Sequence, residues 1–247
     1  FVLILFIFIK RNEIKPLFGE SGSTWLAYAG FVASLTFSIY CYRHLPMIDF
    51  RPYAIGKSIP EGMKLPPNAV TDSVVMVFIY EKDGKRMELS MDQISGIDST
   101  YKFVDRTDKV IREGDKAPIH DFSIVSADGT DVTADVLSMD RVFLLVAYDL
   151  EKSDEDAQSR INDFVALSQK AGVEFIGLTS SAPATVDAFK KKHHSAFEYY
   201  FTDGTTLKTM IRSNPGLLLL KKGTVAAMWH HNDLPAFDEV NSMYLSK

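Results

Sequence analysis

The stretch Arg141–Leu150, Arg-Val-Phe-Leu-Leu-Val-Ala-Tyr-Asp-Leu, decides the fold of this chain. Its consecutive apolar residues, 142–147, are rich in branched and aromatic types and are typical of a strand buried on both faces in the middle of a sheet. The acidic residues that follow, 151–156, suit the first turn of a helix, where negative charge meets the positive end of the helix dipole. Many α/β proteins place a reactive group at such a transition. Here it holds no cysteine, no glycine-rich loop and no Ser–His pair.

Strands and helices alternate on the C-terminal side of this strand. An amphipathic helix is predicted over 155–171, ending at Gly172, and Pro183 suits the first turn of a helix that runs to about His193. The remaining elements are strands at 121–126, 131–133, 173–178 and 198–201, a helix at 204–211, a hairpin of 216–220 with 225–229, and a helix at 235–245. Alternating strands and helices predict a parallel sheet core, to which the last hairpin adds antiparallel edge strands.

Residues 114–247 resemble the thioredoxin-like fold in its peroxiredoxin or thiol-reductase-associated form, a central mixed sheet flanked by helices. The motifs that carry the resemblance are Gly-Asp-Lys-Ala-Pro at 114–118 with Phe122, the Asp128-Gly129 hairpin, strand 142–147, Asp203 with the helix through Leu207, Asn214-Pro215 in the cis-proline position, and Lys-Lys-Gly-Thr-Val at 221–225. Members active in thiol chemistry carry a cysteine in the loop after the central strand, which here is 149–156 and holds none. Thiol–disulfide exchange requires a thiolate nucleophile. The resemblance therefore implies a domain that does not catalyse this exchange by itself.

A membrane span is predicted ahead of this domain. The 18 residues Trp25–Tyr42 carry no charge and have aromatic residues at both ends, which is typical of the two interfaces of a bilayer. At 1.5 Å per residue they cover about 27 Å, and inclusion of Arg43 and Leu45 completes a transmembrane helix over 25–45. A buried core helix, the alternative, normally has a polar stripe. The lipid bilayer is thus the first predicted partner.

The apolar run Phe1–Ile9 is too short for a full span of about 20 residues. It is either the end of a truncated transmembrane helix or the hydrophobic region of a signal peptide. Because Lys10-Arg11 follows the run instead of preceding it, the truncated helix is favoured, and we expect the chain to be a fragment. The basic residues of the connector, 10–24, favour a cytoplasmic connector, which would place everything after Arg43 in the periplasm.

Residues 46–113 are expected to form a tether and a small β-rich insert. The first part, 46–70, contains five prolines, which rule out a regular helix and predict an extended path over other surfaces. Strands are predicted at 73–80 and 86–91, joined by the Asp83-Gly84 turn, with another short pair at 101–104 and 109–112. Such an insert is too small for a large core of its own. We expect it to pack on the next domain.

The whole layout also resembles Bacteroidetes-type proteins of the DoxX family with a C-terminal extension. The residues that carry this resemblance are 42–46, Tyr-Arg-His-Leu-Pro, with 48–52, Ile-Asp-Phe-Arg-Pro, and 212–216, Arg-Ser-Asn-Pro-Gly. In that family a four-helix membrane region precedes an extra span and an outward thioredoxin-like domain. The resemblance implies that 1–9 ends the fourth helix and 25–45 is the fifth, with most of the membrane module outside this chain.

The strongest candidate site is Asn214-Pro215. A proline that opens a strand after a loop is predicted to be cis, and in the thioredoxin-like fold this position faces the cysteine loop and receives extended peptides. Tyr148, Asp149 and Arg212 are expected to complete a shallow groove, with Arg212 paired to Asp149 or to a neighbouring acid. The competing interpretation is that the motif is purely structural.

No metal, cofactor or catalytic residue is predicted. A metal site needs three or four ligands, and the pair His193-His194 has none nearby. The rings of His230 and His231 are expected to point to opposite faces of a strand, so they cannot easily share a metal.

The charge balance excludes nucleic acid as a partner. Residues 1–45 carry four basic and two acidic residues, which leaves 23 of the 27 basic and 30 of the 32 acidic residues for the remainder. Phosphate binding draws on clustered Lys and Arg, so an acidic soluble part argues against it. The single cysteine, Cys41, cannot form an intrachain disulfide and does not assign a compartment.

Three functions remain open. The leading hypothesis is a membrane-anchored, non-catalytic module at the outer face of the cytoplasmic membrane that binds or positions a protein or peptide partner. A rival is the substrate-presenting part of a membrane oxidoreductase whose redox cysteines lie in a DoxX-like region upstream of residue 1. The third is a purely structural tether.

Overall fold

The computed structural model describes residues 2–10 and 20–246. The helices are α1 (Val2–Lys10), α2 (Glu20–Arg43), α3 (Ile59–Gly62), α4 (Met91–Ile94), α5 (Thr133–Ser138), α6 (Gln158–Lys170), α7 (Pro183–His193), α8 (Gly204–Met210) and α9 (Phe237–Val240), which continues as a π-helix over Asn241–Leu245. The strands are β1 (Ser73–Lys82), β2 (Lys85–Ser90), β3 (Lys102–Arg112), β4 (Val142–Val146), β5 (Glu174–Thr179), β6 (Tyr199–Phe201), β7 (Gly216–Lys221) and β8 (Thr224–His230).

The main domain is built on a five-stranded mixed sheet in the order β6-β5-β4-β7-β8. β5 lies parallel to the central strand β4, and β6 parallel to β5, whereas β7 is antiparallel to β4 and β8 to β7. In the centre, Leu144 pairs with Ile176 on one side and with Leu218 on the other. These are the strand order and directions of the thioredoxin-like fold, and the predicted fold class is confirmed.

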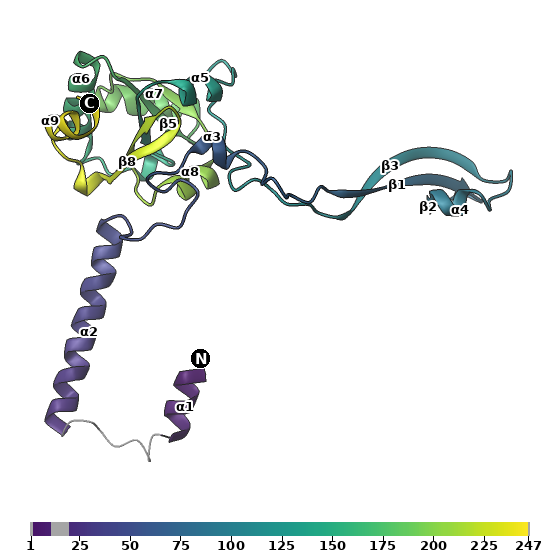
Figure 1. The fold of residues 1–247 in the computed structure, drawn as a ribbon, viewed down its shortest axis with the longest axis horizontal. Helices are drawn as coiled ribbons and strands as arrows, with labels where there is room; N and C mark the ends of the chain where they lie inside the picture. Colours follow the sequence, from purple (N-terminus) through teal and green to yellow (C-terminus); the bar gives the residue numbers. More distant parts are fainter. Residues whose placement is uncertain (1, 11–19, 247) are drawn as a thin grey trace.

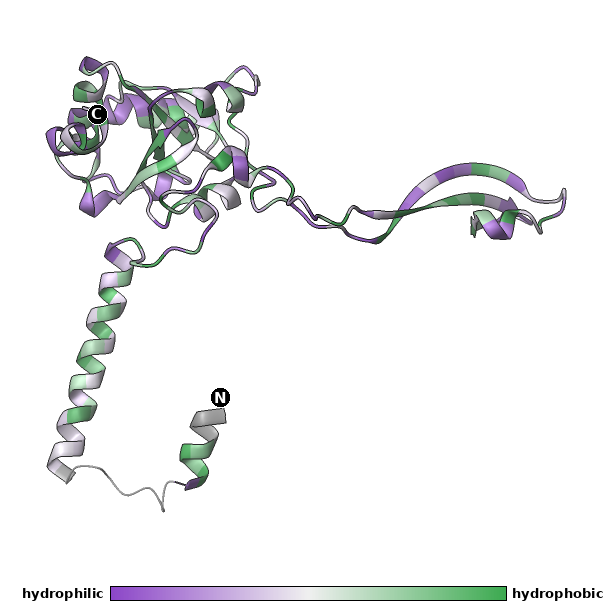
Figure 2. Cartoon of the chain, viewed as in Figure 1, coloured by the Kyte–Doolittle hydropathy of each residue, from purple (hydrophilic) through white to green (hydrophobic). Residues whose placement is uncertain are grey.

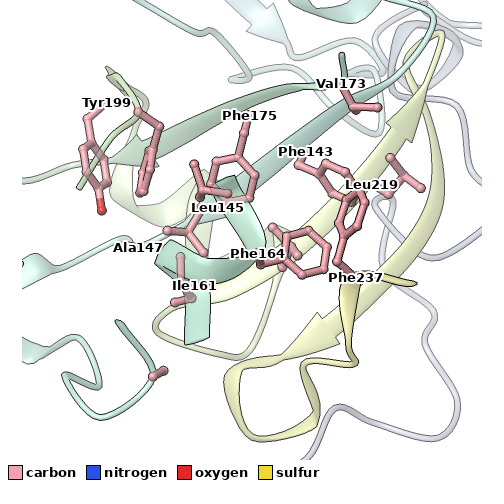
Figure 3. Close-up of a cluster of buried hydrophobic side chains, with 14 of the residues drawn as sticks. Phe143, Leu145, Ala147, Ile161, Phe164, Val173, Phe175, Tyr199, Leu219 and Phe237 are labelled. Atoms are coloured by element: carbon pink, nitrogen blue, oxygen red, sulfur yellow. The ribbon is translucent and has the colours of Figure 1, made fainter. Parts of the chain in front are cut away.

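The side chains of β4 enter two cores because successive residues of a strand point to opposite faces. Phe143 and Leu145 lie in one core, with residues of α6, α7 and α9, while Leu144 lies in the other, with residues of α5 and α8. Figure 3 shows the first core, in which the ring of Phe143 meets that of Phe164 edge-on at 5.1 Å. Every residue of β4 is buried, which explains its apolar sequence.

The second core also takes side chains from the segment after the apolar helix. Tyr53 is 3% exposed and Ile59 is fully buried, and both belong to this core. Ser58 starts α3, where its hydroxyl accepts a hydrogen bond from the backbone N–H of Glu61. The chain that leaves α2 is therefore bound to the main domain before it reaches β1.

One helix of the described residues is long and apolar enough to cross a membrane, Ser21–Arg43 within α2, and none of its most apolar window is buried against the protein. Figure 2 shows this helix, whose residues are mostly coloured as hydrophobic, extending away from the main domain. The predicted end of an earlier helix, residues 1–9, falls largely in α1. Most of the predicted connector lies outside the described residues.

The β-rich insert is a long arm and does not pack on the main domain as predicted. Its three strands form a separate sheet in the order β2-β1-β3, and Figure 1 shows it extending away from the five-stranded sheet. At its base the two chain segments are joined by hydrogen bonds from Asp115 N to Val70 O (2.8 Å) and from Gly114 N to the Asp72 carboxylate (2.6 Å).

The two short strands predicted at 101–104 and 109–112 are also wrong, because they are one continuous strand, β3. The prediction left residues 105–108, Asp-Arg-Thr-Asp, outside both strands. Since β3 is exposed along its whole length, its charged side chains stay in water and do not oppose strand formation.

Three further boundaries differ from the predictions. The acidic run is not the first turn of α6: Leu150–Lys152 forms a 3₁₀ helix, and α6 begins only at Gln158. The predicted strand at 121–126 forms isolated bridges only, from Val125 to Asp131 and to Phe201. The last helix begins at Phe237, two residues later than expected.

Candidate functional site

The loop between α8 and β7 is held against the loop that follows β4. The Asn214–Pro215 peptide bond is cis, as predicted. The side-chain amide N–H of Asn214 donates to the backbone carbonyl of Asp149 (2.7 Å). The backbone carbonyl of Asn214 accepts a hydrogen bond from the backbone N–H of Asp154 (2.9 Å). Asn214 thus fixes the distance between the cis-proline loop and the loop in which thiol-active members carry cysteine.

A third wall comes from the end of the apolar helix. The Asn232 side-chain amide donates to the carbonyl of Arg43 (3.0 Å), and His44 Nδ1 lies 2.7 Å from an Asp233 carboxylate oxygen. His44 also stacks on Tyr40 with ring centroids 4.7 Å apart. The 3₁₀ helix His231–Asp233 therefore holds the last turn of α2 against the main domain.

These three walls enclose an open groove with a volume of about 760 Å³. The last turns of α2 contribute Tyr42 and Arg43, the loop after β4 contributes Tyr148, and the cis-proline loop contributes Arg212 and Asn214. We call this cavity the anchor groove. It lies where the end of the apolar helix α2 meets the loop after β4 and the cis-proline loop before β7.

The sequence-predicted residues are distributed over three places. Tyr148, Arg212 and Asn214 line the anchor groove. Asp149 lines a neighbouring hollow of about 330 Å³ on the other side of the loop, and Pro215 is buried beneath the surface. The five residues are close together, but two of them do not form the groove wall.

The predicted ion pair between Arg212 and Asp149 is not formed. The Asp149 carboxylate lies 2.7 Å from the Lys152 ammonium group, and this hydrogen bond lowers the pKa of Asp149. Arg212 is exposed and makes no ion pair with any described residue, but together with the hydrogen-bonded Arg51 its charge lowers the pKa of the nearby Asp49 carboxyl. Arg212 lines both the anchor groove and a smaller hollow beside Asp49, so its guanidinium can be reached from the groove.

The histidines at the end of β8 are placed differently from the prediction. The rings of His230 and His231 do not point to opposite faces, because the chain leaves the strand at His230, and their centroids lie 4.1 Å apart. Burial lowers the pKa of His230 to about 4, and the neighbouring His231 contributes to the shift. No group of three or more His, Cys, Asp or Glu side chains in the described part of the chain is arranged to hold a metal.

The residues of α2 were missed as members of the site. Arg43 and Cys41 both line the anchor groove, and the Cys41 side chain is exposed. Cys41 was identified only as a thiol inside the apolar segment. Nothing in the sequence indicates that the end of this helix contacts the main domain through residues 189 positions apart, Arg43 and Asn232. The groove therefore contains a thiol that comes from α2.

The fixed charges of the groove are mainly positive. Arg43, Lys152 and Arg212 line it together with one carboxylate, that of Asp154. The Asp154 carboxylate lies 3.4 Å from His231 Nε2, and Lys152 is paired with Asp149. An anionic or acidic segment would consequently be preferred to a basic one.

A family model described as a domain of unknown function (DUF8463) matches residues 74–113. The match lies on the arm that β1, β2 and β3 form, and it covers neither the anchor groove nor α2. No curated protein matches the chain.

Solved structures that resemble the chain include a thioredoxin-like protein from Aeropyrum pernix, with 15% identity over 51% of this chain and 89% of the other at a TM-score of 0.41. Yeast Sco1 shows 14% identity over 51% and 93% at a TM-score of 0.41. A thiol:disulfide interchange protein from Bacteroides sp. shows 11% identity over 51% and 86% at a TM-score of 0.39.

Proposed function

We propose that this chain is a membrane-anchored, non-catalytic thioredoxin-like module that binds an extended segment of a partner protein at the outer face of the cytoplasmic membrane. The observation that carries the proposal is the construction of the anchor groove. The end of an apolar helix forms one wall and the cis-proline loop forms another, so a bound segment lies at the membrane surface.

The absence of thiol catalysis is supported by the chemistry of exchange. A thiolate attacks a disulfide to give a mixed disulfide, and a second thiol must then attack to release the product. Residues 149–156 contain no cysteine, and Cys41 is the single cysteine of the sequence. This chain can therefore form a mixed disulfide but has no second thiol with which to resolve it.

The groove favours a peptide with acidic side chains or a terminal carboxylate. Arg212 is exposed and unpaired among the described residues, and its planar guanidinium can bind a carboxylate through two hydrogen bonds. The half-buried ring of Tyr148 offers an apolar contact beside it. Together they would recognise an acidic residue next to an apolar one.

A second function is favoured by the position of Cys41. If redox cysteines lie in a DoxX-like membrane region outside this chain, the groove would present a disulfide-containing substrate to them, beside the membrane helix. The exposed Cys41 thiol in the groove wall is the observation that favours this alternative. In that case replacement of Cys41 by Ser would lower the yield of oxidised or reduced substrate, whereas a purely binding module would be unaffected.

The test uses the full chain in detergent micelles or lipid nanodiscs and a displayed library of random peptides. We expect selected peptides to be acidic and to bind with a Kd of about 1–100 μM. Arg212→Ala and Tyr148→Ala should each weaken binding by about tenfold, or about 1.4 kcal/mol. Lys222→Ala, in the β7–β8 turn at the other end of β7, is the matched control and should bind like the parent.

Peptides whose binding is equally insensitive to all three substitutions would contradict the proposal. Selection of basic peptides would contradict the assigned charge preference. Loss of binding in Cys41→Ser, together with a covalent adduct in the parent that reducing agent removes, would favour the oxidoreductase alternative.

A further inference from the structure

The outer edge of the arm is a strand with no neighbour on one side. β3 is the last strand of the sheet β2-β1-β3, and all of its residues are exposed. Such an edge presents a row of backbone N–H and C=O groups that can pair with another strand. Figure 1 shows this edge standing clear of the main domain, so a second strand can approach it.

The sequence of β3 is self-complementary about Thr107. It reads Lys-Phe-Val-Asp-Arg-Thr-Asp-Lys-Val-Ile-Arg from Lys102 to Arg112. If a second copy of the strand runs antiparallel with Thr107 opposite Thr107, Asp105 faces Lys109 and Arg106 faces Asp108. Thr107 faces its own copy, and opposite charges face each other at the four flanking positions 105, 106, 108 and 109, which favours antiparallel pairing.

The faces of the sheet agree with this register. Arg106 lies opposite Phe78 on β1 and Asp108 opposite Met76, so these two charges share one face. Asp105 and Lys109 share the other face. A twofold axis perpendicular to the sheet at Thr107 keeps each face on its own side, so both kinds of ion pair can form at once.

The charges are available for this pairing. The side chains of Arg106 and Asp108 make no ion pair with any described residue. Lys109 reaches the Glu88 carboxylate at 3.0 Å, but both side chains are more than three-fifths exposed, so this contact is readily exchanged.

The ends of the strand limit the paired length. Lys102 would face Arg112, which are like charges. The register between β1 and β3 shifts between Ile79 and Tyr80 and again between Ser73 and Val74, which places bulges near both ends of β3. Val104 and Ile111 are the residues without a partner on β1 at these two bulges. Bulges terminate pairing, so the paired segment is 105–109 and the like charges stay apart.

We propose that two copies of this chain associate through their β3 edges and form a continuous six-stranded sheet from the two arms. The strand that pairs with β3 is the β3 of a second copy. Pairing with a strand of an unrelated protein would not explain why the sequence of β3 is complementary to itself. Figure 2 shows the hydrophilic middle of β3 beside the more hydrophobic β1, so the contact is specified by charge and backbone pairing.

The test is a charge exchange in the full chain, measured by sedimentation velocity in detergent between about 1 and 100 μM. The parent is expected to be a dimer within this range. Arg106→Asp and Asp108→Arg should each weaken the dimer at least about tenfold, because two attractive pairs become repulsive in each dimer. Lys85→Asp changes the charge equally on the far strand β2 and should leave the dimer unchanged.

The two single variants also test each other. In an equimolar mixture, Asp at 106 of one chain faces Arg at 108 of the other, and the remaining pair joins the natural Arg106 to the natural Asp108. We expect the mixture to form a heterodimer, and the double variant Arg106→Asp with Asp108→Arg to regain the parent's dimer. A parent that is monomeric at every concentration, or a mixture that stays monomeric, overturns the proposal.

A cross-link locates the axis. Residues opposite each other in antiparallel strands have Cα atoms about 4.5–5.5 Å apart, which is within the range of a disulfide. Thr107→Cys in a Cys41→Ser background should give a covalent dimer on mild oxidation with copper phenanthroline. Lys85→Cys in the same background should not. Equal cross-linking at both positions overturns the assigned edge.

Discussion

His230 makes the stability of the main domain depend on pH. Its side chain is 3% exposed at the end of β8, and its Nδ1 accepts a hydrogen bond from the backbone N–H of Asn232 (3.1 Å). Its pKa is lowered to about 4, chiefly by burial and also by the charges of His231 and His44, while Asp233 and Asp154 oppose the shift. The folded domain therefore holds His230 neutral and resists its protonation.

The size and the sign of the effect follow from this pKa. In the unfolded chain His230 titrates near 6.5, so the unfolded state binds more protons than the folded state between pH 6.5 and 4. The stabilisation of the folded state by the neutral His230 ring is complete above pH 6.5 and is lost as the pH falls to 4. A pKa unit corresponds to about 1.36 kcal/mol, so the free energy of unfolding should fall by about 3 kcal/mol across this window.

His230→Asn removes the titrating ring and keeps an acceptor for the Asn232 N–H. We expect the variant to lose about 3 kcal/mol less than the parent between pH 6.5 and 4. The assay is urea unfolding followed by the fluorescence of Trp229, which neighbours His230, in a Trp25→Phe background that leaves one tryptophan.

The reasoning is refuted if the difference in unfolding free energy between parent and variant is the same at pH 7 and at pH 4.5. If the variant does not fold, the pKa of His230 can be measured directly in the parent by following the NMR chemical shift of its ring with pH. An imidazole that titrates at its ordinary pKa in the folded parent would also refute it.

Three further predictions follow from the core, the cysteine and the anchor. Phe143→Ala should lower the free energy of unfolding by about 3–5 kcal/mol in urea titrations, because it removes a fully buried ring that contacts Phe164 and Phe175; a loss below about 1 kcal/mol would contradict this packing. The full chain should not reduce insulin disulfides, and Cys41→Ser should not alter this, whereas turnover typical of thiol enzymes would show that the domain is catalytic. Alkaline phosphatase fused after Lys247 should be active, because the basic residues of the connector predict by the positive-inside rule that the domain lies in the periplasm; activity of a reporter that works only in the cytoplasm would reverse this orientation.

The core of the main domain could be predicted because burial on both faces leaves a clear pattern. The apolar residues of β4 and the Asn214-Pro215 motif indicated the central strand and the loop opposite it, and both are present. The arm was mispredicted for the opposite reason. β3 is exposed on both faces, so its residues are not selected for burial, and the largely charged residues 105–108 were left outside the predicted strands.

The site could be predicted only where its parts follow from the fold. Tyr148, Arg212 and Asn214 were identified because the fold places their loops together. The contribution of the end of α2 could not be predicted. Arg43 contacts Asn232 and His44 contacts Asp233, and such single contacts leave no periodic pattern in the sequence. Arg212 was expected to form an ion pair with Asp149. The carboxylate of Asp149 is instead paired with Lys152, which lies three residues further along the same 3₁₀ turn.

The central claim is that the anchor groove holds a partner polypeptide, and photo-cross-linking from within it tests this most directly. A benzophenone amino acid would replace Tyr42, an exposed residue of the groove wall outside the recognition pair Tyr148 and Arg212, or, as a control, Lys222 in the β7–β8 turn, in cells that express the full chain. We predict a discrete polypeptide adduct from position 42 that is absent from position 222 and unchanged by Cys41→Ser. The same adducts from both positions, or none from position 42, would contradict the claim.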